Sequence, residues 1–124
     1  MELDAISLKM VEAMIAMEGG SSQSALQSFL DVLDVNPAES RALLFVGQLY
    51  AQQGDIDEAG AYFELAQMYP EVSYDAYYSH AELLLGLGQR AEALDKLRQA
   101  AIIRPNEGLS QIIRSVEDTG RLVR

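Results

Sequence analysis

The amino-acid sequence predicts an all-α fold of about seven helices arranged in consecutive pairs. Three observations support this prediction. Glycines recur at a 34-residue step, at Gly20, Gly54 and Gly88. Between them, apolar residues recur three and four residues apart, which places them on one side of an α-helix. No segment alternates apolar and polar residues as a strand would. A period of about 20–50 residues is typical of proteins whose repeated units stack side by side.

The central repeat shows how one unit should fold. Its first helix places apolar and small residues on one side, Gly54 ends that helix, and Asp55 is a suitable cap for the next helix. Small residues at Gly47 and Ala59 would let the two helices approach closely. The full pattern of this repeat is Leu43, Val46, Gly47, Tyr50, Gly54, Ala59, Phe63, Ala66 and Pro70.

The first repeat fits this pattern only with a shift of one residue. Without the shift, Lys9 and Glu12 would lie between the paired helices, and burying two unpaired charges costs several kcal/mol. We therefore expect Leu8, Val11 and Ile15 to form the buried side of the first helix. The loop that begins at Gly19 would absorb the additional residue.

After Pro105 the pattern begins again and then stops, which predicts a capping helix, with a truncated fourth repeat as the alternative. We expect a single domain over residues 1–124, with repeats at about 5–39, 40–73 and 74–105 and a cap at 106–120. The predicted helices cover residues 3–18, 22–35, 38–53, 56–69, 72–87, 90–103 and 106–119.

The central repeat resembles the tetratricopeptide repeat (TPR) family, and the third repeat matches the same pattern. This resemblance implies a right-handed superhelical solenoid in which the first helix of each pair lines a concave groove. It also implies protein–protein interaction as the function. The matching residues of the third repeat are Tyr77, Ala81, Leu84, Gly88, Ala93, Leu97, Ala100 and Pro105.

The charge of the chain argues against nucleic-acid binding. Its net charge is −10, whereas a nucleic-acid interface needs a basic face. The acidic surface would serve solubility or attract a basic partner. The N-terminal stretch carries Glu2, Asp4 and Glu12, so it fits neither a secretory signal nor a membrane-spanning helix. We therefore expect a cytoplasmic protein without membrane insertion.

Candidate catalytic residues are scarce. The chain has no cysteine and one histidine, His80, which lies in an apolar stripe and is expected to be structural. Asp55, Asp57 and Glu58 cluster at a helix start, where carboxylates interact favourably with the helix dipole. We expect no enzyme activity, no metal and no cofactor.

The resemblance assigns a partner-binding groove to the first helix of each repeat. We expect Met10 and Met17 to face this groove beside Phe45, which would make one end apolar, while Asp75 and Glu82 make the other end acidic. Of the basic residues with which related proteins hold a C-terminal carboxylate, only Lys9 is retained. The predicted groove residues are Ile6, Lys9, Met10, Met17, Arg41, Leu44, Phe45, Gln48, Gln52, Asp75, Tyr78 and Glu82.

Two functional hypotheses follow. The first is an adaptor or scaffold that holds a peptide segment of a partner, with an apolar anchor and basic residues, in the groove. The second is a small acidic chaperone of type III secretion that binds an apolar client. The stretch from Ser79 to Leu85 is similar to the third repeat of such chaperones. Self-association of the chain stays open in both hypotheses.

Overall fold

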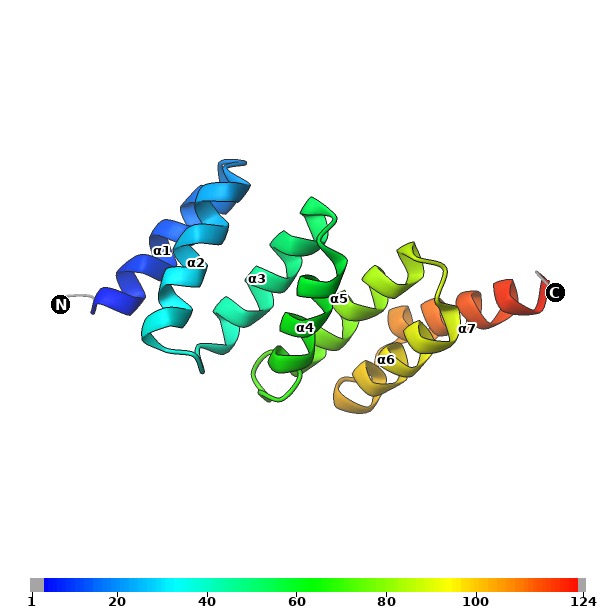
Figure 1. Cartoon of the computed structure of the whole chain (residues 1–124). Coiled ribbons are helices and arrows are strands. Elements are labelled where there is room, and N and C mark those ends of the chain that lie inside the picture. The colour runs from blue at the N-terminus through cyan, green and yellow to red at the C-terminus, as the bar shows by residue number, and fades with distance from the viewer. Residues whose placement is uncertain (1–3, 123–124) are drawn as a thin grey trace. The chain divides into compact units, whose positions relative to one another are not determined.

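The computed structural model describes the backbone of residues 4–122 and the side chains of residues 4–120. In this part of the chain the only regular elements are α-helices, seven in number (Figure 1). Their bounds are α1 Ala5–Glu18, α2 Ser22–Val35, α3 Ser40–Gln53, α4 Ile56–Ala66, α5 Ser73–Gly86, α6 Arg90–Ile103 and α7 Glu107–Leu122. The helices belong to two compact units, one ending at Ala66 and the other starting at Gln67. The predicted all-α class is confirmed.

Most helix bounds lie within three residues of the predicted ones, and the differences have local causes. Helix α3 begins at Ser40 rather than at residue 38, because the Asn36 side chain accepts a hydrogen bond from the Ala38 N–H at 3.2 Å and forms a turn. Helix α4 ends at Ala66 rather than at residue 69, ahead of Pro70. The predicted start of the first helix at residue 3 lies outside the described residues.

The first unit contains α1 to α4, and buried residues of α1, α2 and α3 form an apolar core against which Tyr62 of α4 packs. Helix α2 contributes Phe29 to the centre of this core, and the Phe29 ring stacks on Phe45 of α3 with 5.1 Å between the ring centroids. Helices α3 and α4 approach closely at Gly47, where a Cβ atom would lie 2.7 Å from the Phe63 ring. The aromatic ring thus occupies the space that the glycine leaves free.

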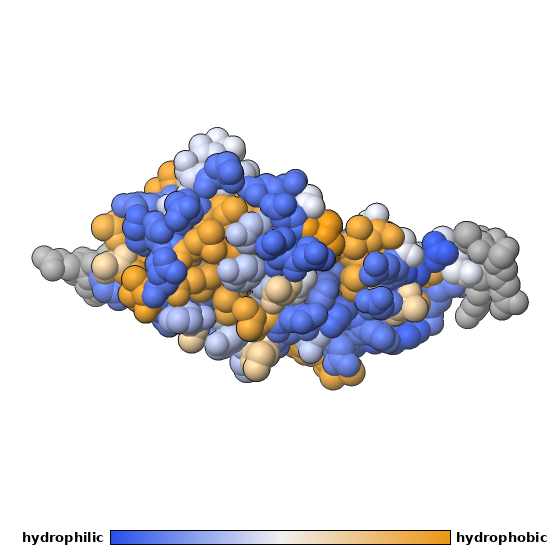
Figure 2. Space-filling model, in the orientation of Figure 1, coloured by the Kyte–Doolittle hydropathy of each residue, from blue (hydrophilic) through white to orange (hydrophobic). Residues whose placement is uncertain are grey.

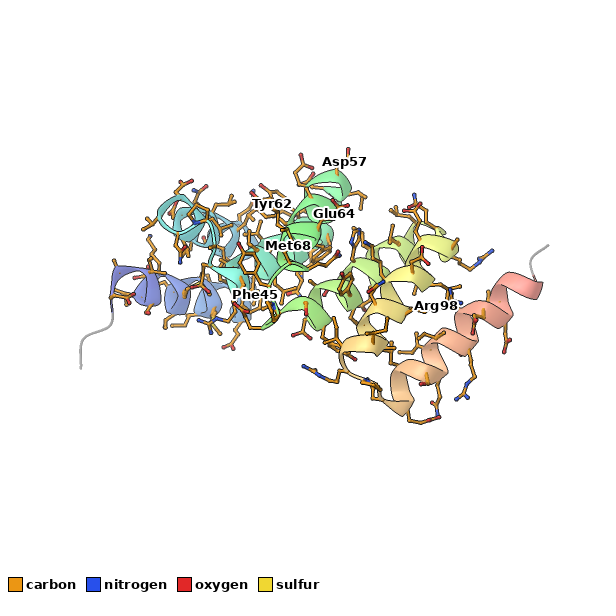
Figure 3. All side chains as sticks on the ribbon, turned by 90° about the horizontal axis from the view of Figure 1, so that it is seen from below. Phe45, Asp57, Tyr62, Glu64, Met68 and Arg98 are labelled. Atoms are coloured by element: carbon orange, nitrogen blue, oxygen red, sulfur yellow. The ribbon has the colours of Figure 1, made fainter. Side chains whose placement is uncertain are left out.

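The second unit contains α5 to α7. Its core consists of Ala81 from α5, Leu97 and Ala100 from α6, and Leu109 from α7. An ion pair at 3.0 Å also joins α6 to α7, from Arg98 to Glu117; Figure 3 labels Arg98. Helix α7 packs against α6 and contributes to the same core, while its role as a cap rather than a truncated fourth repeat stays a prediction.

The backbone shows that the 34-residue step holds without a shift in all three repeats. At the end of each first helix, a backbone N–H donates to the carbonyl oxygen five residues earlier, at 2.9–3.0 Å. The glycines of these turns have left-handed φ angles of 81°, 82° and 77°, which glycine adopts without strain. The three hydrogen bonds are Ser21 to Ala16, Asp55 to Tyr50 and Gln89 to Leu84.

The shifted register predicted for the first helix is therefore wrong. Ala13, and not Glu12, takes the small-residue position of Gly47 and Ala81, and it is fully buried. Met10, expected at the groove surface, is only 2% exposed. The expected buried residues are instead exposed: Leu8 by 48%, Val11 by 43% and Ile15 by 65%.

The physical reason is that the side of α1 that carries Lys9 and Glu12 is open to solvent in this structure. Both residues occupy their unshifted positions with exposed side chains. The Lys9 ammonium lies 3.8 Å from a carboxylate oxygen of Asp31 in α2 and 4.0 Å from one of Glu12. Since Lys9 and Glu12 are not buried, the unshifted register carries no free-energy cost for burying their charges.

We predict that Met10→Glu destabilises the fold, because it places an unpaired carboxylate in the core of the first unit. The expected loss of unfolding free energy is at least about 2–4 kcal/mol. Val11→Glu is the matched control: its side chain is exposed, so the loss should stay within about 0.5 kcal/mol. Urea denaturation of both variants measures the difference, and equal stability of the two would contradict the unshifted register.

Gly47→Ala should also destabilise, because the added Cβ would lie 2.7 Å from the Phe63 ring. Overfilling a packed site of this kind costs about 1–3 kcal/mol. Gly86→Ala is the control, since an added Cβ there would have no contact within 4 Å beyond its chain neighbours and the backbone of its own helix. The midpoints of thermal unfolding report both changes. A neutral Gly47→Ala would show that α3 and α4 are not in this close contact.

Candidate functional site

An open pocket lies between the first turns of α5 and α7. It has a volume of about 390 Å³, which is enough for a side chain of a bound peptide. Its residues come from α5, from α7 and from the residue directly before α7, so the whole of α6 separates its two sides in the sequence. They are Tyr74, Asp75, Tyr78, Asn106, Gly108, Leu109 and Ile112.

Asn106 fixes the α7 side of the pocket. Its side-chain oxygen accepts a hydrogen bond from the Leu109 N–H at 2.9 Å and so caps the start of α7. Its amide nitrogen donates to the Tyr74 hydroxyl at 3.2 Å and to the Arg104 carbonyl oxygen at 3.0 Å. One side chain therefore ties the loop before α7 to α5.

Two tyrosine rings and a carboxylate give this pocket its chemical character. The Tyr74 and Tyr78 rings stack with 6.4 Å between centroids. The Arg104 guanidinium lies over the Tyr74 ring, 4.3 Å from its centroid, so this aromatic wall already attracts a cation from within the chain. Asp75 is exposed beside the rings. Aromatic faces next to a carboxylate favour a ligand with an apolar stem and a cationic end.

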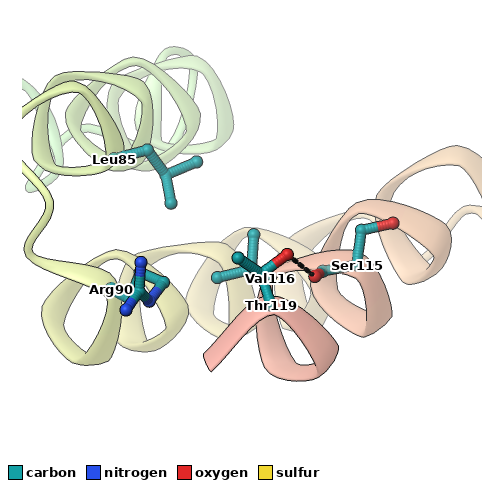
Figure 4. Close-up of a pocket in the computed structure, with 5 residues that line it drawn as sticks. All are labelled: Leu85, Arg90, Ser115, Val116 and Thr119. Carbon is teal, nitrogen blue, oxygen red and sulfur yellow. Dashed lines mark hydrogen bonds between the residues drawn. The ribbon is translucent and has the colours of Figure 1, made fainter. Parts of the chain in front are cut away.

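A second pocket of about 260 Å³ lies between α5, α6 and α7 (Figure 4). Leu85 and Val116 form its apolar part, and Arg90 stands at the start of α6. The Thr119 hydroxyl donates to the Ser115 carbonyl oxygen at 2.8 Å, so it is already engaged within its own helix. These polar groups do not converge on one point as they would around a bound anion.

The structure divides the predicted groove residues of the first unit into three groups. Met10 and Leu44 are buried and belong to the packing of the unit. Ile6, Met17 and Phe45 are half-buried against the core. The polar residues lie nearer the surface: Lys9, Arg41 and Gln52 are exposed and Gln48 is half-buried.

In the second unit, the structure brings Asp75 and Tyr78 together in the α5–α7 pocket. Glu82 is exposed one turn further along α5 and lies outside the pocket lining. Sequence reasoning missed Tyr74, Asn106 and Ile112 as parts of the same site. The position of Asn106 directly after Pro105 and just before α7 was a signal for a helix cap, and it would have pointed to this corner.

The remaining candidate residues lie in the protein interior or at the start of a helix. His80 is buried, and its Nδ1 lies 2.9 Å from the Gln67 side-chain nitrogen. Asp57 and Glu58 lie in the first turn of α4, and Figure 3 labels Asp57. Over the described residues, no three His, Cys, Asp or Glu side chains gather as a metal site would require. Within the same range, no helix is long and apolar enough to span a membrane.

Several solved structures are similar to this chain over most of its length. The TPR domain of Arabidopsis OM64 shares 15% identity and a TM-score of 0.83, covering 93% of this chain and 96% of that one. The Yersinia enterocolitica type III secretion chaperone SycD, solved with a peptide of the translocator YopD, shares 22% identity and a TM-score of 0.84, covering 98% and 95%. The first TPR of Spaghetti (RPAP3), bound to an HSP90 peptide, shares 14% identity and a TM-score of 0.82, covering 92% and 91%. At these identities the likeness concerns the fold.

The comparison with curated protein sequences finds no match. A family description, however, covers more than half of the sequence: the tetratricopeptide repeat model matches residues 10–76. This stretch includes the central repeat. In the structure, that repeat has the close approach of Gly47 to Phe63 and the left-handed turn at Gly54. The chain belongs to the tetratricopeptide repeat family.

Proposed function

We propose that this chain is a non-catalytic adaptor that binds a peptide segment of a partner protein, and that the α5–α7 pocket receives a lysine or arginine side chain of that segment. The observation that carries the proposal is the pocket itself, where Tyr74, Tyr78 and Asp75 meet. The aliphatic stem of the ligand would lie along Tyr78 and Ile112. Its charged end would pair with Asp75.

Charge outside the pocket supports the same ligand class. Glu82 continues the exposed acidic side of α5 beyond Asp75, and neither residue forms an ion pair with another described residue. A peptide with further basic residues would gain from both carboxylates, mainly in its rate of association. Two of the similar structures, the chaperone SycD and the first TPR of Spaghetti, are solved with bound peptides, and this supports peptide binding as the activity proposed for this chain.

A second candidate function is that of a chaperone for an apolar secreted client. The observation that favours it is the similarity to SycD over nearly the full length of both chains. In that case the chain should co-purify with one insoluble, membrane-active client when the two are co-expressed. An adaptor should instead be recovered with a soluble assembly.

Selection from a displayed library of linear peptides tests the proposed pocket. We expect the selected peptides to be enriched in lysine or arginine. Asp75→Asn should weaken their binding about tenfold, equivalent to about 1.4 kcal/mol, because it removes the charge that pairs with the ligand. Titration calorimetry measures this change.

Asp95→Asn is the matched control, since Asp95 is exposed on α6 away from the pocket lining. It removes the same charge from the same unit and should leave the affinity unchanged. Equal weakening by the two substitutions would mean that net charge, and not the pocket, selects the ligand. Peptides without basic residues would contradict the proposal directly.

A further inference from the structure

Helix α1 carries a second apolar surface, opposite the one that packs into the core. Leu8, Val11 and Ile15 form it, and we refer to these three residues as the α1 outer stripe. At about 100° per residue they lie within about 60° of one another and on the side of the helix away from Met10. All three are more than 40% exposed. Figure 2 shows hydrophobic surface between hydrophilic patches over the α1 and α2 part of the molecule.

The same unit shows what normally covers such a face. In the unshifted 34-residue register, the α1 outer stripe corresponds to Ala42, Phe45 and Leu49 of α3. Ala42 and Leu49 are fully buried, and Phe45 stacks on Phe29 of the preceding helix α2. Helix α1 therefore exposes the same face that α3 buries. On α3 this face is covered by α2, which contributes the large apolar side chain of Phe29.

The spacing of the α1 outer stripe also points to a helical occupant. Leu8, Val11 and Ile15 follow one another at steps of three and four residues, as do the residues that meet along the seam of two packed helices. Asp4 and Glu18 continue the same spacing at the two ends and are exposed. An apolar seam that ends in carboxylates matches a partner helix with an apolar stripe and basic ends.

The charges around the stripe decide between a partner and a second copy of the chain. Residues 1–66 contain eleven acidic and two basic side chains. The one base in α1, Lys9, is already close to Glu12 and Asp31. Asp4 accepts a hydrogen bond from the Ser7 N–H at 2.7 Å, which lowers the pKa of Asp4 and keeps it ionised. A second copy that met the stripe with its own first unit would bring a surface of the same sign, whereas a basic helix would be attracted.

We propose that the α1 outer stripe docks a basic amphipathic helix of another protein. This helix would pack against α1 in the same way that α2 packs against α3. This surface lies in the first unit and is separate from the α5–α7 pocket. It gives the adaptor a second contact whose ligand is a helix, whereas the pocket takes an extended peptide side chain.

A labelled three-heptad peptide with leucine at its seam positions and lysine at the flanking positions serves as the probe. Mutual repulsion of the lysines keeps the peptide from pairing with itself, so its seam is available. We expect the chain to bind it with saturation in fluorescence anisotropy. The same peptide with glutamate in place of lysine should bind at least about tenfold more weakly. Equal binding of the two peptides would overturn the charge argument.

Ile15→Ser tests the stripe, with Ile102→Ser as the matched control because Ile102 is also an exposed isoleucine, 74% exposed on α6 against 65% for Ile15. Neither substitution should alter the thermal stability. We expect Ile15→Ser to weaken binding of the lysine peptide about tenfold or more, while Ile102→Ser and Asp75→Asn leave it unchanged. The Asp75→Asn variant distinguishes the two proposals, because it should weaken binding at the α5–α7 pocket and leave binding at the α1 outer stripe unchanged.

Sedimentation of the chain without peptide completes the test. We expect a monomer at concentrations where the lysine peptide binds. A dimer that Ile15→Ser dissociates would identify a second copy as the occupant and overturn the proposal. Equal loss of peptide binding in the Ile15 and Ile102 variants would overturn it as well.

Discussion

The close approach of paired helices at one small residue per repeat is the constraint on which the rest of this structure depends. Ala13, Gly47 and Ala81 occupy this position, and all three are buried. At Gly47 the Phe63 ring lies within 2.7 Å of where a Cβ would stand. Since a packed interior tolerates little change of volume, this contact fixes how each first helix is rotated about its axis. The rotation in turn determines which residues of each first helix stay exposed on the surface.

Both proposed binding surfaces result from this rotation. In the second unit it directs Asp75 and Tyr78 of α5 toward the start of α7, where Asn106 closes the pocket. In the first unit it directs Met10 inward and leaves Ile15 outside. The two surfaces differ in chemistry, because one combines aromatic rings with a carboxylate and the other is an apolar stripe. A protein that uses both would recognise two different segments, and binding two segments of one partner raises the overall affinity through effective concentration.

The two units also differ in charge, and this difference influences how each can bind. Residues 1–66 are strongly acidic, while residues 67–124 contain eight acidic and seven basic side chains. Ion pairs within the second unit, such as Arg98 with Glu117, use part of that basic charge. Long-range attraction of the proposed basic partner would therefore come mainly from the first unit. Close recognition in the proposed pocket would depend on individual groups such as Asp75.

The sequence by itself determined the repeat length, the number of helices in the described part of the chain and, to within three residues, the places where they end. Gly20, Gly54 and Gly88 specify left-handed turns wherever the chain is folded, because the preference of glycine for such turns is local. The family resemblance placed Asp75 and Tyr78 in the predicted groove, and that assignment to a binding surface stays a prediction. Only the tertiary structure decided which side of α1 is buried. That helix is apolar on two opposite sides, and the choice between Met10 and Ile15 depends on which helices are its neighbours. The pocket was likewise beyond the sequence, since Tyr74 and Asn106 are 32 residues apart and meet only when α7 packs beside α5.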